Sequence, residues 1–482
     1  MADRAQLSRE ETLMLRRTYV ADSCELHFAQ DPLKIVSSRA QYLVDDCGFE
    51  YLDCASRTNN VGHCHPAVVQ AATSQMGTLN TCILESEIDD SAQREFSAKL
   101  LNTLPPNFDV CFFTTSGTEA NDLALQLARS YTQRNGIVVV DGSFHGASQL
   151  VMDISPKVFP KQPPGKKPWV HVVPCPDVYR GPYGEDDPEH CEKYVQDSKS
   201  VIDKAMQDQH KVACFISEPV MVVYGVVVPP KGWLSKIYSY IHKVGGLVIA
   251  DEIQTGLGRC GSALWTFQAL GAVPDIVTIG KGVGCGHPMA GLVTSRQIAN
   301  SMPDIYHRCQ CSPVAGAIGK VVLDVLQSEG LQENARKIGT HLLEQFRRLR
   351  AAHRCLGDVR GMGLIIGVEI VWSQESRKPS PQLAEKLANK LREQQVIVTN
   401  EGQYSNVLVF LPSLCLTLLD ADSLTHKMDT VLMEVEVEES FDVGRILNSQ
   451  PSSSNGLYDC ADESLSPSSD ENGASTSYNT LD

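Results

Sequence analysis

Lys281 is the residue in this sequence best placed for covalent chemistry. It follows an apolar segment, 276–279, that is predicted to be a short buried strand, and it precedes Gly282, Gly284 and Gly286. A lysine carried from a buried strand into a loop with few side chains can lose its hydration and become a nucleophilic, Schiff-base-forming amine. A solvated loop lysine is the alternative, and the glycine spacing does not decide the matter because it is not the dinucleotide-binding pattern.

A carboxylate at the end of an upstream strand makes the Schiff-base interpretation more specific. The segment 245–254 contains a second predicted buried strand, and Asp251 lies at its end. Pyridoxal phosphate requires this pair, because a carboxylate keeps its pyridine nitrogen protonated while a lysine holds its aldehyde. Asp251 and Lys281 are therefore the candidate catalytic residues, and pyridoxal 5'-phosphate is the expected cofactor.

A candidate phosphate site lies where a strand turns into a helix. The predicted strand over 110–114 leads to Ser116, Gly117 and Thr118, and a helix is predicted over 122–131. Small residues let an anion approach the free N–H groups and the positive end of a helix dipole. An ordinary capping turn is the alternative.

Three more candidates follow predicted strands. Phe144 and His145 lie on a glycine-flanked turn after the strand over 137–141, where the phenylalanine either lies on a cofactor ring or belongs to the core. Glu218 follows the strand over 213–217. Alternating strands and helices predict a doubly wound, mostly parallel α/β sheet, and such sheets bind ligands beyond the carboxyl ends of their strands. The candidates all fall at such ends, which predicts one shared site.

The composition is that of a globular enzyme and excludes several other classes. In 482 residues, 58 acidic and 42 Lys and Arg residues give a net charge of −16, which argues against a general nucleic-acid-binding surface. No apolar run is long enough to span a membrane. The 16 cysteines, including Cys309 and Cys311, have neither disulfide-framework nor zinc spacing, so we expect a reducing compartment and no metal. The first 20 residues lack a secretory signal and leave the cytoplasm and the mitochondrial matrix open.

Two local patterns need an interpretation of their own. The histidines of Gly62–Pro66 are interpreted as a polar turn before a proline-initiated helix rather than as metal ligands. Segment 155–190 is rich in proline, glycine and charge, and is predicted to be a long, functional excursion rather than a core element.

The sequence divides into four predicted regions. They are 1–70, an N-terminal segment joining the small domain; 71–315, the large cofactor-binding domain; 316–440, the small α+β domain; and 441–482, an acidic, serine-rich disordered tail.

With these motifs in place, the chain resembles the class III pyridoxal-phosphate aminotransferases of fold type I over roughly residues 10–440. Its nearest branch resembles the phospho-lyases that act on phosphoethanolamine and 5-phosphohydroxylysine, which are relatives of alanine–glyoxylate aminotransferase 2. The branch resemblance rests on segments 31–36, 121–125, 153–156 and 176–183. It implies a large domain with a mostly parallel sheet, a smaller α+β domain, and a homodimer with shared active sites.

The resemblance implies a role for each candidate residue. Lys281 would hold the cofactor aldehyde and then carry protons, Asp251 would pair with the pyridinium nitrogen, and Gln254 would hydrogen-bond to the ring hydroxyl. The other implied residues are Ser116, Gly117 and Thr118 around the phosphate, Phe144 stacked on the ring with His145 beside it, and Glu218 on the substrate side.

Three stretches depart from the family pattern. Arg308 stands in place of a threonine that the family donates to the neighbouring subunit's phosphate, and the following glycine pair is missing. Cys285 replaces an expected asparagine. Leu408–Ser413 contains neither the carboxylate-binding arginine of the aminotransferases nor the lysine of the phospho-lyases. We therefore expect intact cofactor binding, with Arg308 as a candidate ligand, and altered substrate recognition.

Three functions fit these observations. The first is a phospho-lyase that eliminates phosphate and ammonia from a phosphorylated amine or amino acid. The second is an ω-amine or alanine–glyoxylate-type aminotransferase, which the missing carboxylate-binding cation disfavours. The third is a catalytically weak, cofactor-binding interaction protein acting through its acidic tail. The resemblance favours the mitochondrial matrix over the cytoplasm.

Overall fold

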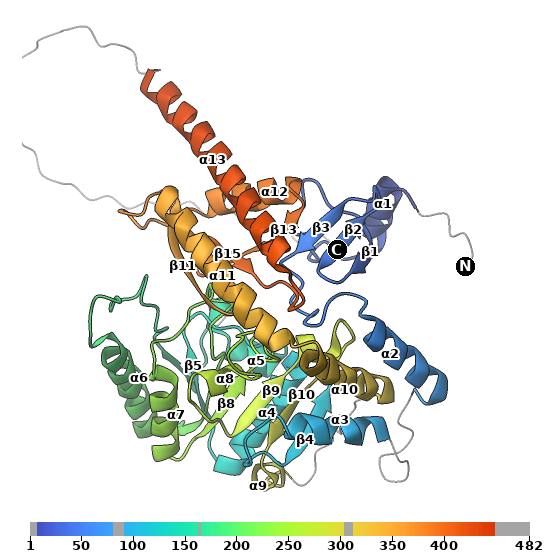
Figure 1. Cartoon of the computed structure of the whole chain (residues 1–482). Coiled ribbons are helices and arrows are strands. Elements are labelled where there is room, and N and C mark those ends of the chain that lie inside the picture. Colours follow the sequence, from blue (N-terminus) through green and yellow to red (C-terminus); the bar gives the residue numbers. More distant parts are fainter. Residues whose placement is uncertain (1–6, 81–90, 162–164, 303–311, 449–482) are drawn as a thin grey trace, which may run out of the picture. The chain divides into compact units, whose positions relative to one another are not determined.

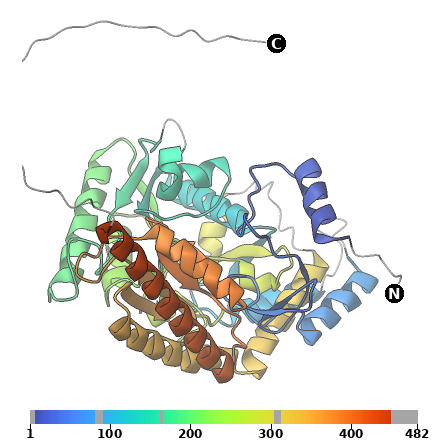
Figure 2. The same cartoon turned by 90° about the horizontal axis from the view of Figure 1, so that it is seen from above.

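The computed structural model describes residues 7–80, 91–161, 165–302 and 312–448 (Figure 1; Figure 2 shows the chain from above). Packing groups the residues up to Val435 into one compact unit and those from Glu436 into another. Arg308, the Cys309–Cys311 stretch and the tail from residue 449 lie outside the described residues. The subdivision at residues 70, 315 and 440 stays a prediction.

A seven-stranded sheet forms the centre of the first unit and confirms the predicted mostly parallel α/β fold (Figure 1). Its spatial order is β4-β10-β9-β8-β7-β5-β6, and only β10 runs antiparallel to its neighbours. The strands are β4 (Val110–Thr114), β5 (Gly136–Val140), β6 (Val170–Val173), β7 (Val212–Ser217), β8 (Leu247–Asp251), β9 (Ile276–Ile279) and β10 (Ala290–Thr294).

Helices cover both faces of this sheet, which explains why its inner strands are almost entirely apolar. Alternate residues of a strand point to opposite faces. Ile137 and Val139 therefore pack in the cluster that contains α4, whereas Val138 and Val140 pack in the cluster that contains α6 and α7. The helices of this region are α3 (Ser91–Leu101), α4 (Gly117–Thr132), α5 (Gln149–Asp153), α6 (His190–Gln207), α7 (Trp233–Lys243), α8 (Thr266–Ala269) and α9 (Arg296–Ala299).

Two four-stranded sheets, ordered β1-β2-β3-β13 and β11-β12-β15-β14, join distant parts of the chain. Parallel pairing of β13 with β3 ties the N-terminal segment to the C-terminal region. Their strands are β1 (Ile35–Arg39), β2 (Tyr42–Asp45), β3 (Glu50–Asp53), β11 (Leu356–Met362), β12 (Ile365–Ile370), β13 (Val396–Ile397), β14 (Thr399–Glu401) and β15 (Val407–Phe410). The remaining helices are α1 (Arg9–Tyr19), α2 (Pro66–Thr78), α10 (Pro313–Ser328), α11 (Leu331–Ala352), α12 (Pro381–Glu393) and α13 (Leu418–Asn448).

The structure corrects one prediction and shows a break in the helical segment after residue 312. The excursion over 155–190 is not free of core elements, because β6 pairs in parallel with β5 at the edge of the central sheet. This strand, Val-His-Val-Val, is only four residues long and is flanked by proline and charge, so it resembled a loop. The helical pattern after residue 312 is two helices, since Gly330 takes a left-handed conformation with φ of 62° between them.

Gly339 in α11 allows that helix to lie against the turn between β11 and β12. A Cβ atom on Gly339 would lie 2.1 Å from the carbonyl oxygen of Gly363. Gly339→Ala should therefore lower the free energy of unfolding by about 2 kcal/mol, measured by urea denaturation, because the backbone must move. Gly77→Ala is the matched control, since no atom lies within 4 Å of its added Cβ and alanine favours the helix by up to about 1 kcal/mol. An equal response of the two variants would contradict this packing.

Candidate active site

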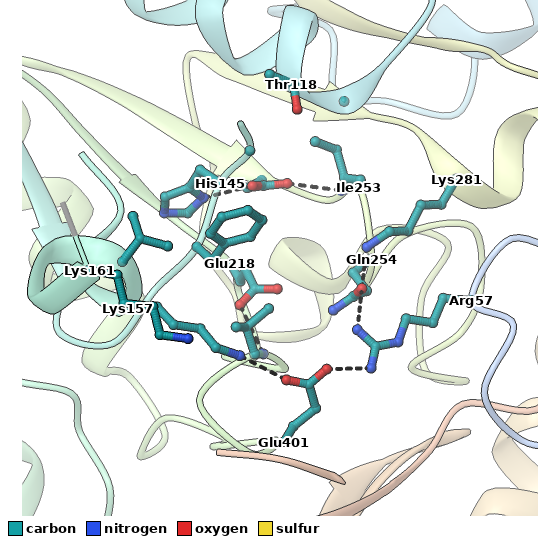
Figure 3. Close-up of a pocket in the computed structure, with 16 residues that line it drawn as sticks. Arg57, Thr118, His145, Lys157, Lys161, Glu218, Ile253, Gln254, Lys281 and Glu401 are labelled. Atoms are coloured by element: carbon teal, nitrogen blue, oxygen red, sulfur yellow. Dashed lines mark hydrogen bonds and ion pairs between the residues drawn. The ribbon is translucent and has the colours of Figure 1, made fainter. Parts of the chain in front are cut away.

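The carboxyl ends of the parallel strands converge on one cavity of about 540 Å³ (Figure 3). Asp251 ends β8 opposite Thr278 of β9, and Lys281 begins the short 3-10 helix η2 (Lys281–Gly284) after β9. This register places the acid and the lysine at the same edge of the sheet. The cavity is lined by Arg57, Gly117, Thr118, Phe144, His145, Gly146, Lys157, Val158, Lys161, Glu218, Val223, Asp251, Ile253, Gln254, Lys281 and Glu401.

Asp251 is buried, and three neighbouring groups hold its carboxylate. Its Oδ2 atom accepts a hydrogen bond from Asn121 Nδ2 at 2.9 Å and lies 2.7 Å from His145 Nδ1. Its Oδ1 atom accepts one from the backbone N–H of Ile253 at 3.2 Å. Asn121 also donates to the carbonyl of His145 at 2.7 Å, so α4 and the turn after β5 are fixed together around the carboxylate.

Lys281 projects into the cavity and donates to Gln254 Oε1 (Figure 3). Burial, followed by the nearby Arg57 cation, lowers the pKa of Lys281 to about 8. A minority of the amine is therefore uncharged near neutral pH, far more than for an ordinary lysine, and this form is the nucleophile. The backbone of Lys281 takes a positive φ of 43°, a conformation that costs a non-glycine residue about 1 kcal/mol or more.

The glycine after Lys281 has a packing reason. A Cβ atom on Gly282 would lie 2.5 Å from Cγ of Asn60, so the lysine loop rests directly on that side chain. Asn60 Oδ1 in turn accepts from Arg259 Nη2 at 2.8 Å, and Arg259 Nη1 donates to the carbonyl of Pro412 at 2.7 Å. Arg259 is buried, and its hydrogen bonds connect the lysine loop to the C-terminal strands.

The N-terminus of α4 forms another wall of the cavity and begins earlier than the predicted residue 122. Ser116 is its N-cap and accepts from the backbone N–H of Glu119 at 3.3 Å, while Gly117 and Thr118 line the cavity. A Cβ atom on Gly117 would lie 2.7 Å from Ile253, so a larger residue would close this end. The free N–H groups of a helix N-terminus favour a phosphate here.

These residues fit pyridoxal phosphate on structural grounds. Among the described residues, Gln254 Nε2 and His145 Nε2 are buried without a hydrogen-bond partner at the cavity. A buried donor left unpaired is costly, and a cofactor oxygen would satisfy the Gln254 amide. Gln254 would hold the ring hydroxyl, Asp251 the ring nitrogen, Lys281 the aldehyde, and Gly117 with Thr118 the phosphate.

Glu218 lies in the same cavity, and its Oε2 atom accepts from the N–H of Val223 at 3.4 Å. Burial, followed by the nearby Asp251 carboxylate, raises the pKa of Glu218 to about 8. Glu218 is therefore largely protonated at neutral pH and adds little negative charge to the cavity.

The cavity brings together eight of the ten predicted site residues. The two others are Ser116, which caps α4 and does not line the cavity, and Arg308, which lies outside the described residues. The eight are Gly117, Thr118, Phe144, His145, Glu218, Asp251, Gln254 and Lys281. Their individual roles stay predictions.

Sequence reasoning missed four charged residues that line the cavity, because they lie far apart along the chain. Glu401 in β14 lies 2.6 Å from Arg57 Nη2 and 2.9 Å from Lys157 Nζ (Figure 3). Burial would raise the pKa of Glu401, but the Arg57 and Lys157 cations outweigh it and hold the pKa below its ordinary value. Lys161 is the fourth, and the only signal for the two lysines was their position in the functional excursion over 155–190.

The structure gives ordinary explanations for two sequence patterns, the histidines of Gly62–Pro66 and the Leu408–Ser413 stretch. His63 Nε2 lies 2.7 Å from Asp53 Oδ2, and His65 caps α2 by accepting from the N–H of Ala67 at 3.3 Å. α2 begins at Pro66, as predicted. In the cation-free stretch, Leu408–Ser413, every side chain is buried.

The low pKa of Lys281 predicts how apoenzyme takes up its cofactor. The rate of pyridoxal phosphate uptake, followed by the absorbance of the lysine-bound cofactor, should rise with pH around a midpoint near 8, because only the uncharged amine reacts. Arg57→Met should move the midpoint to higher pH, since the Arg57 cation lowers this pKa. A wild-type midpoint near 10.5, the ordinary lysine value, would contradict the desolvated amine.

Comparison with known proteins agrees with this geometry. A curated relative from Drosophila melanogaster, named alanine–glyoxylate aminotransferase 2-like, is 38% identical over 429 residues, covering 86% of each chain. The ethanolamine-phosphate phospho-lyase homolog 1 of Caenorhabditis elegans is 34% identical over 88% of this chain and 94% of its own. Human mitochondrial alanine–glyoxylate aminotransferase 2 is 33% identical over 88% and 86%, respectively.

A solved structure gives the same result. A phospholyase from Arthrobacter, in complex with phosphoethanolamine, superposes with a TM-score of 0.82 and 31% identity, covering 88% of this chain and 99% of its own. The cofactor is pyridoxal phosphate, in agreement with the cavity. Residues 27–432 match the model of the class-III aminotransferases, and the chain belongs to this family of fold type I enzymes.

Proposed function

We propose that this chain is a phospho-lyase that releases phosphate and ammonia from a small phosphorylated amine or amino acid. The observation that carries the proposal is the likeness, at 31% identity and a TM-score of 0.82, to a phospholyase solved with phosphoethanolamine. The phospho-lyase homolog of Caenorhabditis elegans supports it over 94% of its own length. Phosphoethanolamine is therefore the first substrate to test.

The residues of the cavity suit such a reaction. Pyridoxal phosphate, when bound, supplies an aldehyde that joins amines and a ring that accepts electrons. Lys281 takes the proton from the carbon that bears the substrate nitrogen, since burial keeps part of its amine uncharged. Asp251 holds a proton on the ring nitrogen, and its three hydrogen bonds fix the carboxylate in place.

Elimination then needs no second substrate. Phosphate leaves the carbon next to the amine-bearing carbon, taking the C–O electron pair with it. The unsaturated amine that remains reacts with water to give an aldehyde and ammonia. Phosphoethanolamine and water would thus yield acetaldehyde, ammonia and inorganic phosphate.

An aminotransferase is the second candidate, because relatives from Drosophila melanogaster and human bear that name. The same Lys281 would return the proton to the cofactor side, and a keto acid would accept the amino group. The buried Leu408–Ser413 stretch offers no cation, which disfavours an aminotransferase that would bind a substrate carboxylate from this position.

We also propose a homodimer with shared active sites. In its support, α1 buries none of its residues in the single chain, and Met14 and Tyr19 on it are 60% and 80% exposed. A group of exposed apolar side chains on one helix, as opposed to a single one, is typical of a surface that a partner covers. A mitochondrial location is proposed from the human relative's name. No helix among the described residues is long and apolar enough to cross a membrane.

Holoenzyme mixed with phosphoethanolamine should release inorganic phosphate and acetaldehyde in equal amounts, measured by paired colorimetric and coupled-dehydrogenase assays. Lys281→Ala should abolish release because the proton carrier is gone, while its circular dichroism stays unchanged. Asp251→Ala should slow release by about 100-fold or more, as expected when a preorganised electrostatic group is removed. Amino transfer to a keto acid without phosphate release would instead establish the second candidate.

A further inference from the structure

We propose that Lys157 and Lys161 form the binding site for the substrate's phosphate group. The inference rests on the proposed function and extends it, since it names the residues that select a phosphorylated substrate. Both lysines line the cavity that contains Lys281. They replace, from a different segment, the cation that is missing from the buried Leu408–Ser413 stretch.

The two lysines come from one short element, the 3-10 helix η1 (Pro156–Lys161). η1 is anchored to the turn that carries Phe144 and His145. Lys157 N donates to the carbonyl of Ser143 at 3.2 Å, and the backbone N–H of His145 donates to Ser155 Oγ at 3.1 Å. These hydrogen bonds therefore fix the position of both lysines with respect to the turn that carries Phe144 and His145.

Lys157 has hydrogen-bonding capacity left for a ligand. Its Nζ atom lies 2.9 Å from Glu401 Oε2, and an ammonium group has three N–H donors. Glu401 is also held by Arg57 at 2.6 Å, so it orients Lys157 without depending on it. Figure 3 shows Lys157 reaching from η1 to Glu401, with Lys161 on the same side of the cavity.

Lys161 has no ion-pair partner among the residues that the structure describes, although it lines the cavity. Its charge is thus uncompensated within the described part of the cavity wall. A cation without a carboxylate partner attracts an anionic ligand more strongly than one that is already paired.

The combined charge of Glu401, its two cationic partners and Lys161 matches a phosphate monoester. Arg57, Lys157 and Lys161 contribute three positive charges and Glu401 one negative charge, which leaves a net charge of +2. Glu218 is largely neutral because burial raises its pKa. A phosphate monoester carries about −1.5 to −2 at pH 7, whereas a carboxylate carries −1, so charge balance favours the phosphate.

The test is binding of inorganic phosphate to holoenzyme, in which the cofactor's own phosphate already fills the α4 end. Calorimetric titration should give a dissociation constant at least about tenfold weaker for Lys157→Met/Lys161→Met than for wild type, as expected on losing charged hydrogen bonds. Lys166→Met is the matched control, an exposed lysine near η1 that does not line the cavity, and its affinity should stay within about twofold.

Two further measurements keep the test independent of folding and of the proposed reaction. Lys161→Met alone removes an exposed side chain, so this variant should fold normally. Its affinity for phosphate should still fall by more than its affinity for acetate. In wild type, phosphate should compete with phosphoethanolamine, and KM for phosphoethanolamine should rise in both lysine variants. Equal phosphate affinity in wild type and the double variant would overturn the inference. If wild type released no phosphate from phosphoethanolamine, the proposed lyase function would be wrong. The phosphate titration would still show whether Lys157 and Lys161 bind phosphate.

Discussion

The hydrogen bonding of the Asp251 carboxylate determines how the cavity is built. A buried carboxylate is stable only when donors surround it. Here the donors come from α4, from the turn after β5 and from the backbone after β8. The hydrogen bonds to this one carboxylate therefore hold three parts of the cavity wall together. These are the N-terminal end of α4, the turn that carries Phe144, and the end of β8.

The lysine loop depends on a second set of buried contacts. Gly282 packs on Asn60, and Arg259 links Asn60 to the carbonyl of Pro412. Burial of the Arg259 guanidinium lowers its pKa to about 10, and its hydrogen bonds to Asn60 and Pro412 offset the cost of burying it. Asn60 and Arg259 thus join three parts of the chain beside the cavity: the N-terminal segment, the lysine loop and the C-terminal region.

The site was predictable from the sequence where one local rule applied. Asp251, Glu218 and Lys281 were found because each follows an apolar strand, and parallel strands bring such ends together. Arg57, Glu401 and Lys157 were not, because they lie on three segments that are far apart in the sequence and meet only in the folded chain. β6 was missed for a related reason, since a four-residue edge strand is recognisable only by its pairing with β5.

The central claim is that Lys281, among all the lysines of the chain, holds the cofactor. Holoenzyme reduced with borohydride would fix pyridoxal phosphate irreversibly to the amine that carries it, and peptide mass spectrometry would locate the added mass. One modified peptide should be found, with the cofactor on Lys281. Modification at Lys157 or another lysine, or no stable modification, would contradict it.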